Sequence, residues 1–292
     1  MIIMPYYSKG DLINYISNDF YNIKWSDKLF NLKLITIGLI NIHNLDIIHR
    51  DLHSGNIFFD YRPYIGDLGI SKSATESTDN NEKYGIIPYM APEIFQEQKY
   101  TKASDIYSFG MIMWEFMTGR RPFWNRNHDT ELILEIFDGL RPPIVTNAPK
   151  GYIELMKECW DSDPNKRPTA DDIYKRVENM QLEESRNRNK KNPTEIIKSS
   201  DIGPVTTNNP GAIYRSRPLS GMINSAMSLR SLRSQSVNLE KVKRKFEYNN
   251  EDGQSTKRKK LFENENNEIE LDIDIKSLND NEYFTQEYDF DI

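Results

Sequence analysis

The sequence contains only one cysteine, Cys159, among its 292 residues. A single thiol excludes a disulfide framework within the chain and suits a reducing compartment. Long uninterrupted hydrophobic runs are also absent. The longest apolar tract, residues 32–49, is broken by asparagine, histidine and aspartate, which would be costly in hydrocarbon. The tract therefore predicts a buried helix of a soluble domain, and we expect no membrane partner.

Basic residues are not in excess either: 38 lysines and arginines stand against 44 aspartates and glutamates. The net charge of -6 argues against a dedicated nucleic-acid binder. Apolar periodicity and all four tryptophans precede about residue 182, and polar residues dominate afterwards. We therefore predict one globular domain over residues 1–182 and a mostly disordered tail over residues 183–292, because the tail has too little apolar surface to offset its ordering entropy.

The tail has two basic clusters, Lys243–Lys245 and Lys257–Lys260, and an acidic end. Their spacing is typical of a bipartite nuclear-import signal, which would add an import receptor to the partners. We expect a cytoplasmic location, with the nucleus as the alternative.

Hydrophobic patterning predicts a mostly helical domain with a minor strand element. Helices are expected from Leu12 onward, over Lys28–Leu45, after an N-cap at Ser104 as far as Gly119, over Thr130–Asp138, over Pro149–Trp160, and from Thr169 to about Leu182. Short strands are expected at residues 1–4, 57–59 and 64–65, whereas residues 71–83 have no period and predict a loop.

The stretch IIHRDLHSGNIFFD, residues 47–60, places acidic, amide and basic side chains between two apolar runs. Asp51 and Asn56 lie here, and Asp67 follows in the stretch IGDLGIS. Carboxylate and amide oxygens are hard donors suited to Mg²⁺, which binds through one or two carboxylates plus substrate phosphates. The ordered set predicts phosphoryl-group chemistry. Zinc is disfavoured, because His43, His49 and His53 fit neither one helix face nor a short ligand loop.

These residues carry a family resemblance. The matching motifs are His49-Arg50-Asp51-Leu52 with Asn56, Asp67-Leu68-Gly69, Ala91-Pro92-Glu93, the stretch from Ser104 to Gly110, and Cys159-Trp160 followed by Arg167-Pro168. Over residues 1 to about 182 the chain resembles the C-terminal lobe of eukaryotic protein kinases, and specifically the tyrosine-kinase-like branch. The resemblance implies an α+β, protein-kinase-like fold whose N-lobe sheet is largely absent.

The resemblance also implies site roles. Asp51, preceded by His49 and Arg50, would accept the proton of the substrate hydroxyl, while Asn56 and Asp67 would hold Mg²⁺ against the phosphates of ATP. Arg50 would receive a phosphate carried by the activation segment, which ends at Ala91-Pro92-Glu93. Candidate carriers, which otherwise are ordinary solvated hydroxyls, are Ser73, Thr75, Ser77 and Thr78.

Further roles concern the frame and the nucleotide. Glu93 and Arg167 would form a buried ion pair, and Asp105 would hold the backbone of the catalytic loop, residues 49–56, with a simple first-turn aspartate as the alternative. The resemblance gives Met4 the gatekeeper position and Asp11 a ribose contact. The adenine surroundings would be Tyr6, Tyr7, Leu12, Ile57 and Phe58.

Two departures leave the hydroxyl class open. His53 stands where serine/threonine kinases usually carry a lysine, and Ile86 replaces the threonine that would bridge to it. We predict transfer of the ATP γ-phosphate to a protein Ser or Thr hydroxyl, with Tyr as the lesser alternative. No Gly-rich loop or strand lysine precedes Met4, so we expect an incomplete gene model and poor ATP binding by this chain alone. The alternative is an inactive half-kinase that serves as a binding or scaffold module.

Overall fold

The computed structural model describes residues 6–74, 82–189 and 191–233. The chain separates into two units, residues 1–241 and 242–292, and every described residue belongs to the first. Within the described ranges, no helix has the length and apolarity needed to cross a membrane. The predicted strand at residues 1–4, the basic clusters and the acidic end of the tail lie outside the described residues.

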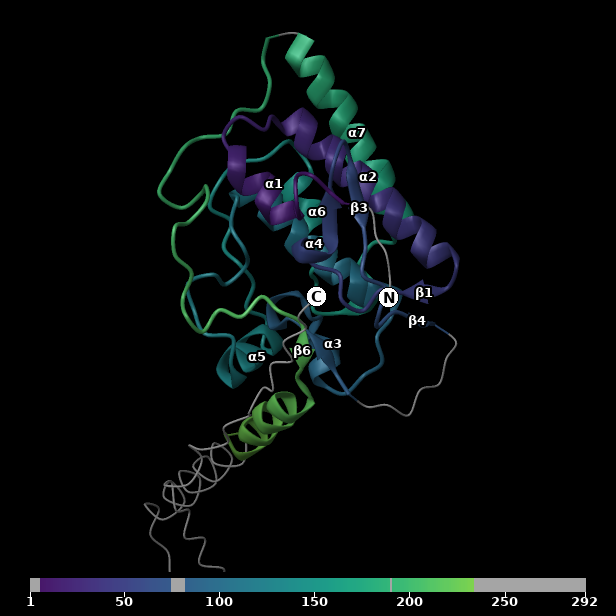
Figure 1. Ribbon diagram of the computed structural model, residues 1–292, viewed down its shortest axis with the longest axis vertical. Coiled ribbons are helices and arrows are strands. Elements are labelled where there is room, and N and C mark those ends of the chain that lie inside the picture. Colours follow the sequence, from purple (N-terminus) through teal and green to yellow (C-terminus); the bar gives the residue numbers. More distant parts are fainter. Residues whose placement is uncertain (1–5, 75–81, 190, 234–292) are drawn as a thin grey trace, which may run out of the picture. The chain divides into compact units, whose positions relative to one another are not determined.

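Helices make up most of the first unit (Figure 1). The α-helices are α1 (Leu12–Asp19), α2 (Trp25–Asn44), α3 (Pro92–Phe95), α4 (Lys102–Thr118), α5 (Thr130–Phe137), α6 (Tyr152–Cys159) and α7 (Ala170–Asn189). Short 3-10 turns are η1 (Ser54–Asn56), η2 (Ile87–Tyr89) and η3 (Pro164–Lys166). A further helical stretch covers residues 220–233.

The strands are all short and pair in twos. They are β1 (Ile47–Ile48), β2 (Ile57–Phe59), β3 (Pro63–Ile65), β4 (Lys72–Ser73), β5 (Tyr84–Gly85) and β6 (Arg217–Pro218). The antiparallel pairs are β1 with β4, β2 with β3, and β5 with β6. The β2–β3 hairpin confirms the strands predicted around residues 57–65, and the mostly helical α+β, kinase-like fold class is confirmed. The loop predicted over residues 71–83 is wrong at its start, because β4 pairs there with β1.

Helix α4 forms the centre of the core, and every residue from Ser104 to Thr118 is buried. A helix that is apolar on nearly every face must be enclosed by other elements. Its N-cap is Thr101, which exchanges hydrogen bonds with Ser104 in a capping box, so the predicted N-cap at Ser104 is wrong by three residues. The helix ends at Gly119 as predicted, where a φ of 74° favours glycine and the ring of Phe20 leaves no room for a Cβ.

Helices α2 and α7 lie side by side (Figure 1), joined at the surface by the Lys33–Glu178 ion pair. Helix α7 begins with the predicted capping box, in which Thr169 and Asp172 exchange hydrogen bonds. It continues to Asn189 instead of ending near Leu182. The reason is Glu184, a buried residue whose carboxylate accepts hydrogen bonds from the backbone N–H and the hydroxyl of Thr194.

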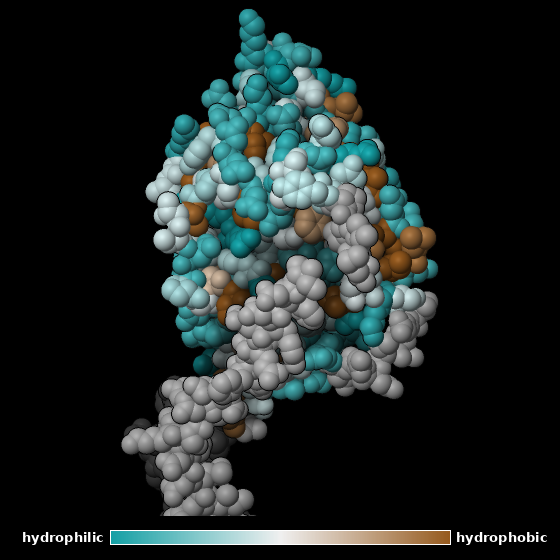
Figure 2. All heavy atoms as spheres, viewed as in Figure 1, coloured by the Kyte–Doolittle hydropathy of each residue, from teal (hydrophilic) through white to brown (hydrophobic). Residues whose placement is uncertain are grey.

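Residues 199–219, which we call the return segment, run back along the domain after α7 (Figure 1). Ile202 and Leu219 are buried, and Arg120 donates hydrogen bonds to the carbonyls of Ser200 and Gly203. This ordered contact differs from the disorder expected of residues 183–292. A few apolar side chains and one arginine hold the segment, although its average composition is polar. Figure 2 shows mainly hydrophilic residues on one face of the molecule, with hydrophobic residues in scattered patches.

Candidate active site

Asp105, in the first turn of α4, holds the loop that contains Asp51. One carboxylate oxygen of Asp105 accepts the backbone N–H of Arg50 at 2.9 Å, and the other accepts the backbone N–H of His49 at 2.8 Å. The imidazole Nε2 of His43 also lies 2.9 Å from this second oxygen. Arg50 has a φ of 72°, a backbone conformation that is costly for a residue with a side chain. The hydrogen bonds from the backbone of His49 and Arg50 to Asp105 hold the loop in this conformation. These contacts go beyond those of a simple first-turn aspartate.

Asp51 is a buried carboxylate that faces a hydroxyl. Its Oδ2 accepts a hydrogen bond from the Oγ of Ser216 at 2.6 Å and lies 3.6 Å from the Nε2 of His53. Burial raises the pKa of Asp51, but the hydrogen bonds and charges of His53, the Ser216 hydroxyl and the charge of His49 outweigh it and hold the pKa below its usual value. Asp51 is therefore ionised at neutral pH and can accept a hydroxyl proton.

His53 has a defined tautomer. Its Nδ1 accepts the backbone N–H of Gly55 at 3.0 Å, so in the neutral ring the proton is on Nε2. That Nε2 lies 3.3 Å from the Oγ of Ser216. The arrangement allows His53 to donate to the hydroxyl oxygen while the same hydroxyl donates to Asp51.

Asn56 and Asp67 lie at the open end of the β2–β3 hairpin. The backbone carbonyl of Asn56 accepts the N–H of Gly66 at 2.9 Å, and the imidazole of His49 donates to the carbonyl of Gly66 at 3.1 Å. Asp67, which follows directly, is exposed, has a φ of 56° and accepts the N–H of Gly69 with one oxygen. The side-chain N–H of Asn56 donates to the carbonyl of Asp51 at 2.9 Å.

The donor set of this site has the chemistry of a magnesium site. Because the Asn56 amide nitrogen is used toward Asp51, its Oδ1 is left as an acceptor, and Asp67 adds a carboxylate. Across the part of the chain that the structure describes, no group of three or more His, Cys, Asp or Glu residues is arranged for a metal. Two oxygen donors nevertheless fit Mg²⁺, which keeps several waters and takes its other ligands from phosphates.

The predicted adenine surroundings are arranged differently from the expectation. Met4 lies outside the described residues, and Tyr6 is 90% exposed. Tyr7 stacks on Phe58 with ring centroids 5.3 Å apart, so it covers the ring expected beneath adenine. Asp11 caps α1 by accepting the N–H of Asn14 at 2.9 Å.

Leu12 and Ile57 require a correction. Both side chains are fully buried in the hydrophobic core, with no exposed surface, although the sequence predicted that they line the lower face of an adenine pocket. The reason is that Leu12 begins the buried face of α1 and Ile57 belongs to the inner face of the β2–β3 hairpin. Neither presents a surface to a nucleotide.

Arg50 is directed toward the start of the activation segment. Its guanidinium lies over the ring of Tyr100 at 4.5 Å and donates to the carbonyl of Ile70 at 3.4 Å. Its Nε is buried and has no hydrogen-bond partner among the described residues. Ser73 lies exposed in β4, and the other candidate phosphate carriers, Thr75, Ser77 and Thr78, lie outside the described residues.

Glu93 and Arg167 form a buried, two-pronged ion pair. The two terminal guanidinium nitrogens of Arg167 each donate to one oxygen of the Glu93 carboxylate at 2.7 Å. Arg167 also donates to the carbonyls of Asp161 and Ala103, so its donors are well used. The pair joins α3 to the start of α4 and to the loop before α7.

Sequence reasoning missed Ser216 at this site, because Ser216 lies far along the chain from Asp51 in a stretch expected to be disordered. The only local signal was an unusual context, with Arg215 and Arg217 on both sides and Pro218 following.

The body is mostly helical, and Asp105 holds the loop that carries Asp51. Together with the oxygen donors Asn56 and Asp67, this arrangement is that of the large lobe of a protein-kinase fold. The family model for protein tyrosine and serine/threonine kinases matches residues 1–177, and the chain belongs to this family.

Similar proteins occur in a virus, an amoeba and a plant. A protein of Acanthamoeba polyphaga mimivirus named "Putative serine/threonine-protein kinase/receptor R818" is 33% identical over 183 residues, which cover 61% of this chain and 11% of that protein. A Dictyostelium discoideum protein named as a probable serine/threonine-protein kinase is 32% identical, covering 61% of this chain and 13% of its own length. An Arabidopsis thaliana protein named "Protein kinase and PP2C-like domain-containing protein" is 29% identical, and the match covers 62% of this chain and 33% of that protein. The chain therefore spans a third or less of these relatives.

Proposed function

We propose that the protein transfers the γ-phosphate of ATP to a serine or threonine hydroxyl of a protein substrate. The observation that carries the proposal is the ionised carboxylate of Asp51, which already accepts an aliphatic hydroxyl at 2.6 Å. Membership of the kinase family and the names of its relatives support this reaction class and the serine/threonine preference.

In this mechanism each residue of the chain has a distinct task. Asp51 orients the hydroxyl and takes its proton, and Asp105 keeps the loop in place through His49 and Arg50. Asn56 and Asp67 would hold Mg²⁺, which when bound neutralises charge on the phosphates. His53 donates a hydrogen bond to the acceptor oxygen from Nε2 and so keeps the hydroxyl hydrogen directed at Asp51.

The test is Mg²⁺-dependent transfer of labelled phosphate from ATP to casein by the full chain. Asp51→Asn should reduce transfer by about 100-fold or more, because it removes the proton acceptor at nearly constant shape. Asp171→Asn, which makes the same change at an exposed position on α7, is the matched control and should leave transfer unchanged. Equal transfer by the two variants would refute the role of Asp51, and no transfer by the wild-type chain even at a saturating concentration of ATP would refute the activity.

A second candidate function is a non-catalytic binding module. The stacking of Tyr7 on Phe58 favours it, because a covered ring offers no face for adenine. Titration of a fluorescent ATP analogue distinguishes the two functions. A kinase should bind the analogue with Mg²⁺, and Tyr7→Ala should strengthen binding if the tyrosine merely covers the site. Absence of binding by both the wild type and this variant would favour the module.

A further inference from the structure

The return segment passes the catalytic loop and places the hydroxyl of Ser216 against the carboxylate of Asp51. The Ser216 Oγ lies 2.6 Å from Oδ2 of Asp51 and 3.3 Å from Nε2 of His53. Both the carboxylate and the imidazole are buried. The serine therefore occupies the position in which the proposed reaction requires the acceptor hydroxyl.

On the N-terminal side of Ser216, the return segment is anchored by Tyr214. The Tyr214 hydroxyl donates to the carbonyl of Pro122 at 2.8 Å, and its ring meets the imidazole of His128 edge-on with centroids 4.8 Å apart. The guanidinium of Arg121 also lies over the Tyr214 ring, 4.8 Å from its centroid. His128 also hydrogen-bonds the carbonyl of Ile213 at 3.0 Å, so both backbone and side chain are held.

On the C-terminal side, the segment adds a strand to the activation segment. Arg217 pairs with Gly85 and Pro218 with Tyr84, in the antiparallel β5–β6 pair. The N–H of Leu219 then donates to the carbonyl of Lys83 at 2.7 Å, and the Leu219 side chain is 1% exposed. Strand addition of this kind is a general mode of peptide recognition, with backbone hydrogen bonds for affinity and side-chain anchors for register.

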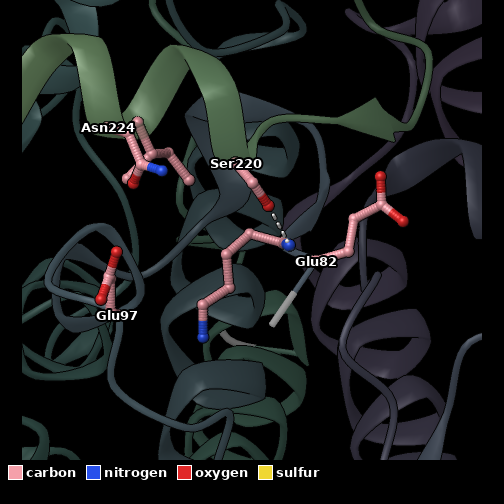
Figure 3. A pocket seen from close by; sticks show the side chains of 6 residues that line it. Glu82, Glu97, Ser220 and Asn224 are labelled. Atoms are coloured by element: carbon pink, nitrogen blue, oxygen red, sulfur yellow. Dashed lines mark hydrogen bonds between the residues drawn. The ribbon is translucent and has the colours of Figure 1, made fainter. Parts of the chain in front are cut away.

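The register is fixed by one more contact. The hydroxyl of Ser220 accepts a hydrogen bond from the backbone N–H of Lys83 at 2.7 Å (Figure 3). Ser220 is also the first residue of the helical stretch of residues 220–233. Beside it is a cavity of about 390 Å³ whose lining residues are Glu82, Lys83, Glu97, Ser220, Ile223 and Asn224. Because anchors lie on both sides of Ser216, the segment cannot slide and the hydroxyl stays at Asp51.

We infer that residues 212–219 are an intramolecular substrate of this site and that Ser216 is the phosphate acceptor. The inference rests on the proposed function for its chemistry. The Oγ–P bond forms, the bond between the γ-phosphorus and the β–γ bridging oxygen of the nucleoside triphosphate breaks, the diphosphate leaves, and the hydroxyl proton passes to Asp51. Until then the segment excludes other substrates, and a phosphate on Ser216 repels Asp51 and releases it.

The first experiment maps phosphate on the full chain incubated with Mg²⁺ and ATP, with and without casein. Phosphate on Ser216, at a fractional rate independent of protein concentration, is the expected result. Ser216→Ala should lose this label and phosphorylate casein more slowly, because the anchors on both sides remain and no phosphate can release the segment, whereas Ser225→Ala, a change at an exposed serine on the following helical stretch, should behave as the wild type. Labelled casein without phosphate on Ser216 would overturn the inference and leave the proposed function standing.

The second experiment does not depend on catalysis. A carboxylate introduced by Ser216→Glu faces Asp51 and should release the segment, so the amides of Leu219 and Lys83 should exchange with deuterium about tenfold faster or more. Ser225→Glu is the control and should leave their exchange unchanged. If no phosphate is transferred to any protein, the proposed function fails, and this exchange result alone decides the docking. Unchanged exchange in Ser216→Glu would overturn the inference.

Discussion

We predict that the buried side chain of Lys28 lowers the stability of the folded protein at neutral pH. It lies on α2 with no exposed surface, and its ammonium has no hydrogen-bond acceptor among the described residues. The nearest groups are aromatic: the Nζ lies 3.9 Å from the ring centroid of Phe20 and 5.2 Å from that of Trp25. Burial lowers the pKa of Lys28 to about 7.

The magnitude follows from this pKa. Lowering a lysine from 10.5 to about 7 costs about 5 kcal/mol at pH 7 and below. The attraction of the ammonium to the rings is part of this balance, because a pKa shift contains every interaction that distinguishes the charged form from the neutral form. Replacing Lys28 by methionine, which has a similar length and no charge, should therefore raise the free energy of unfolding by up to about 5 kcal/mol at pH 7.

The pH dependence has a definite sign. Between pH 7 and 10.5 the unfolded chain binds the Lys28 proton and the folded chain does not, so the wild type gains stability as pH rises through this window. Lys28→Met should lose this gain. The assay is urea unfolding at pH 6.5 and 9.5, with Lys33→Met on the same helix as the control, since Lys33 is partly exposed and paired with Glu178. A less stable Lys28→Met, or an unchanged pH response, would refute the reasoning.

Glu115 is fully buried, and burial raises its pKa to about 7, so wild-type stability should fall by about 3 kcal/mol as pH rises from 4.5 to 7. Glu115→Gln should flatten this fall in urea unfolding; an unchanged slope would contradict it. Glu93→Ala leaves the buried charge of Arg167 unpaired and should cost about 3–5 kcal/mol, measured by thermal unfolding and contradicted by a loss below about 1 kcal/mol. Gly119→Ala meets both a positive φ and the Phe20 ring and should cost about 1–3 kcal/mol in the same assay, with Gly139→Ala, where a Cβ meets no atom, separating the two causes.

Local patterns predicted the elements that depend on nearby residues. The all-round apolar character of α2 and α4 and the turn between β2 and β3 are written into contiguous stretches, and these elements form where they were expected. The misplaced N-cap at Ser104 is a near miss of the same kind, because Thr101 and Ser104 are both capping residues and only their mutual hydrogen bonds decide which one is the cap.

Features that depend on distant partners were not predictable in this way. Strand β4 exists because β1 lies beside it, and α7 extends because Thr194 folds back onto Glu184. The return segment was missed for the same reason: its polar average conceals Leu219, which is buried next to the strand pair that β6 forms with β5. Motifs located Asp51, Asn56 and Asp67, but not the hydroxyl that reaches Asp51.

The backbone around Ser216 bears on which hydroxyl this site takes. Because Arg217, the next residue, is already paired with Gly85, the backbone at position 216 is held close to the catalytic loop. The one-carbon side chain of serine spans this short gap to Asp51 at 2.6 Å. A tyrosine hydroxyl stands several ångströms farther from its own backbone and would require the strand pairing to open. His53 favours the same outcome, since its Nε2 donates to a hydroxyl oxygen close to the backbone. The sequence left the hydroxyl class open at His53, and this register favours serine or threonine.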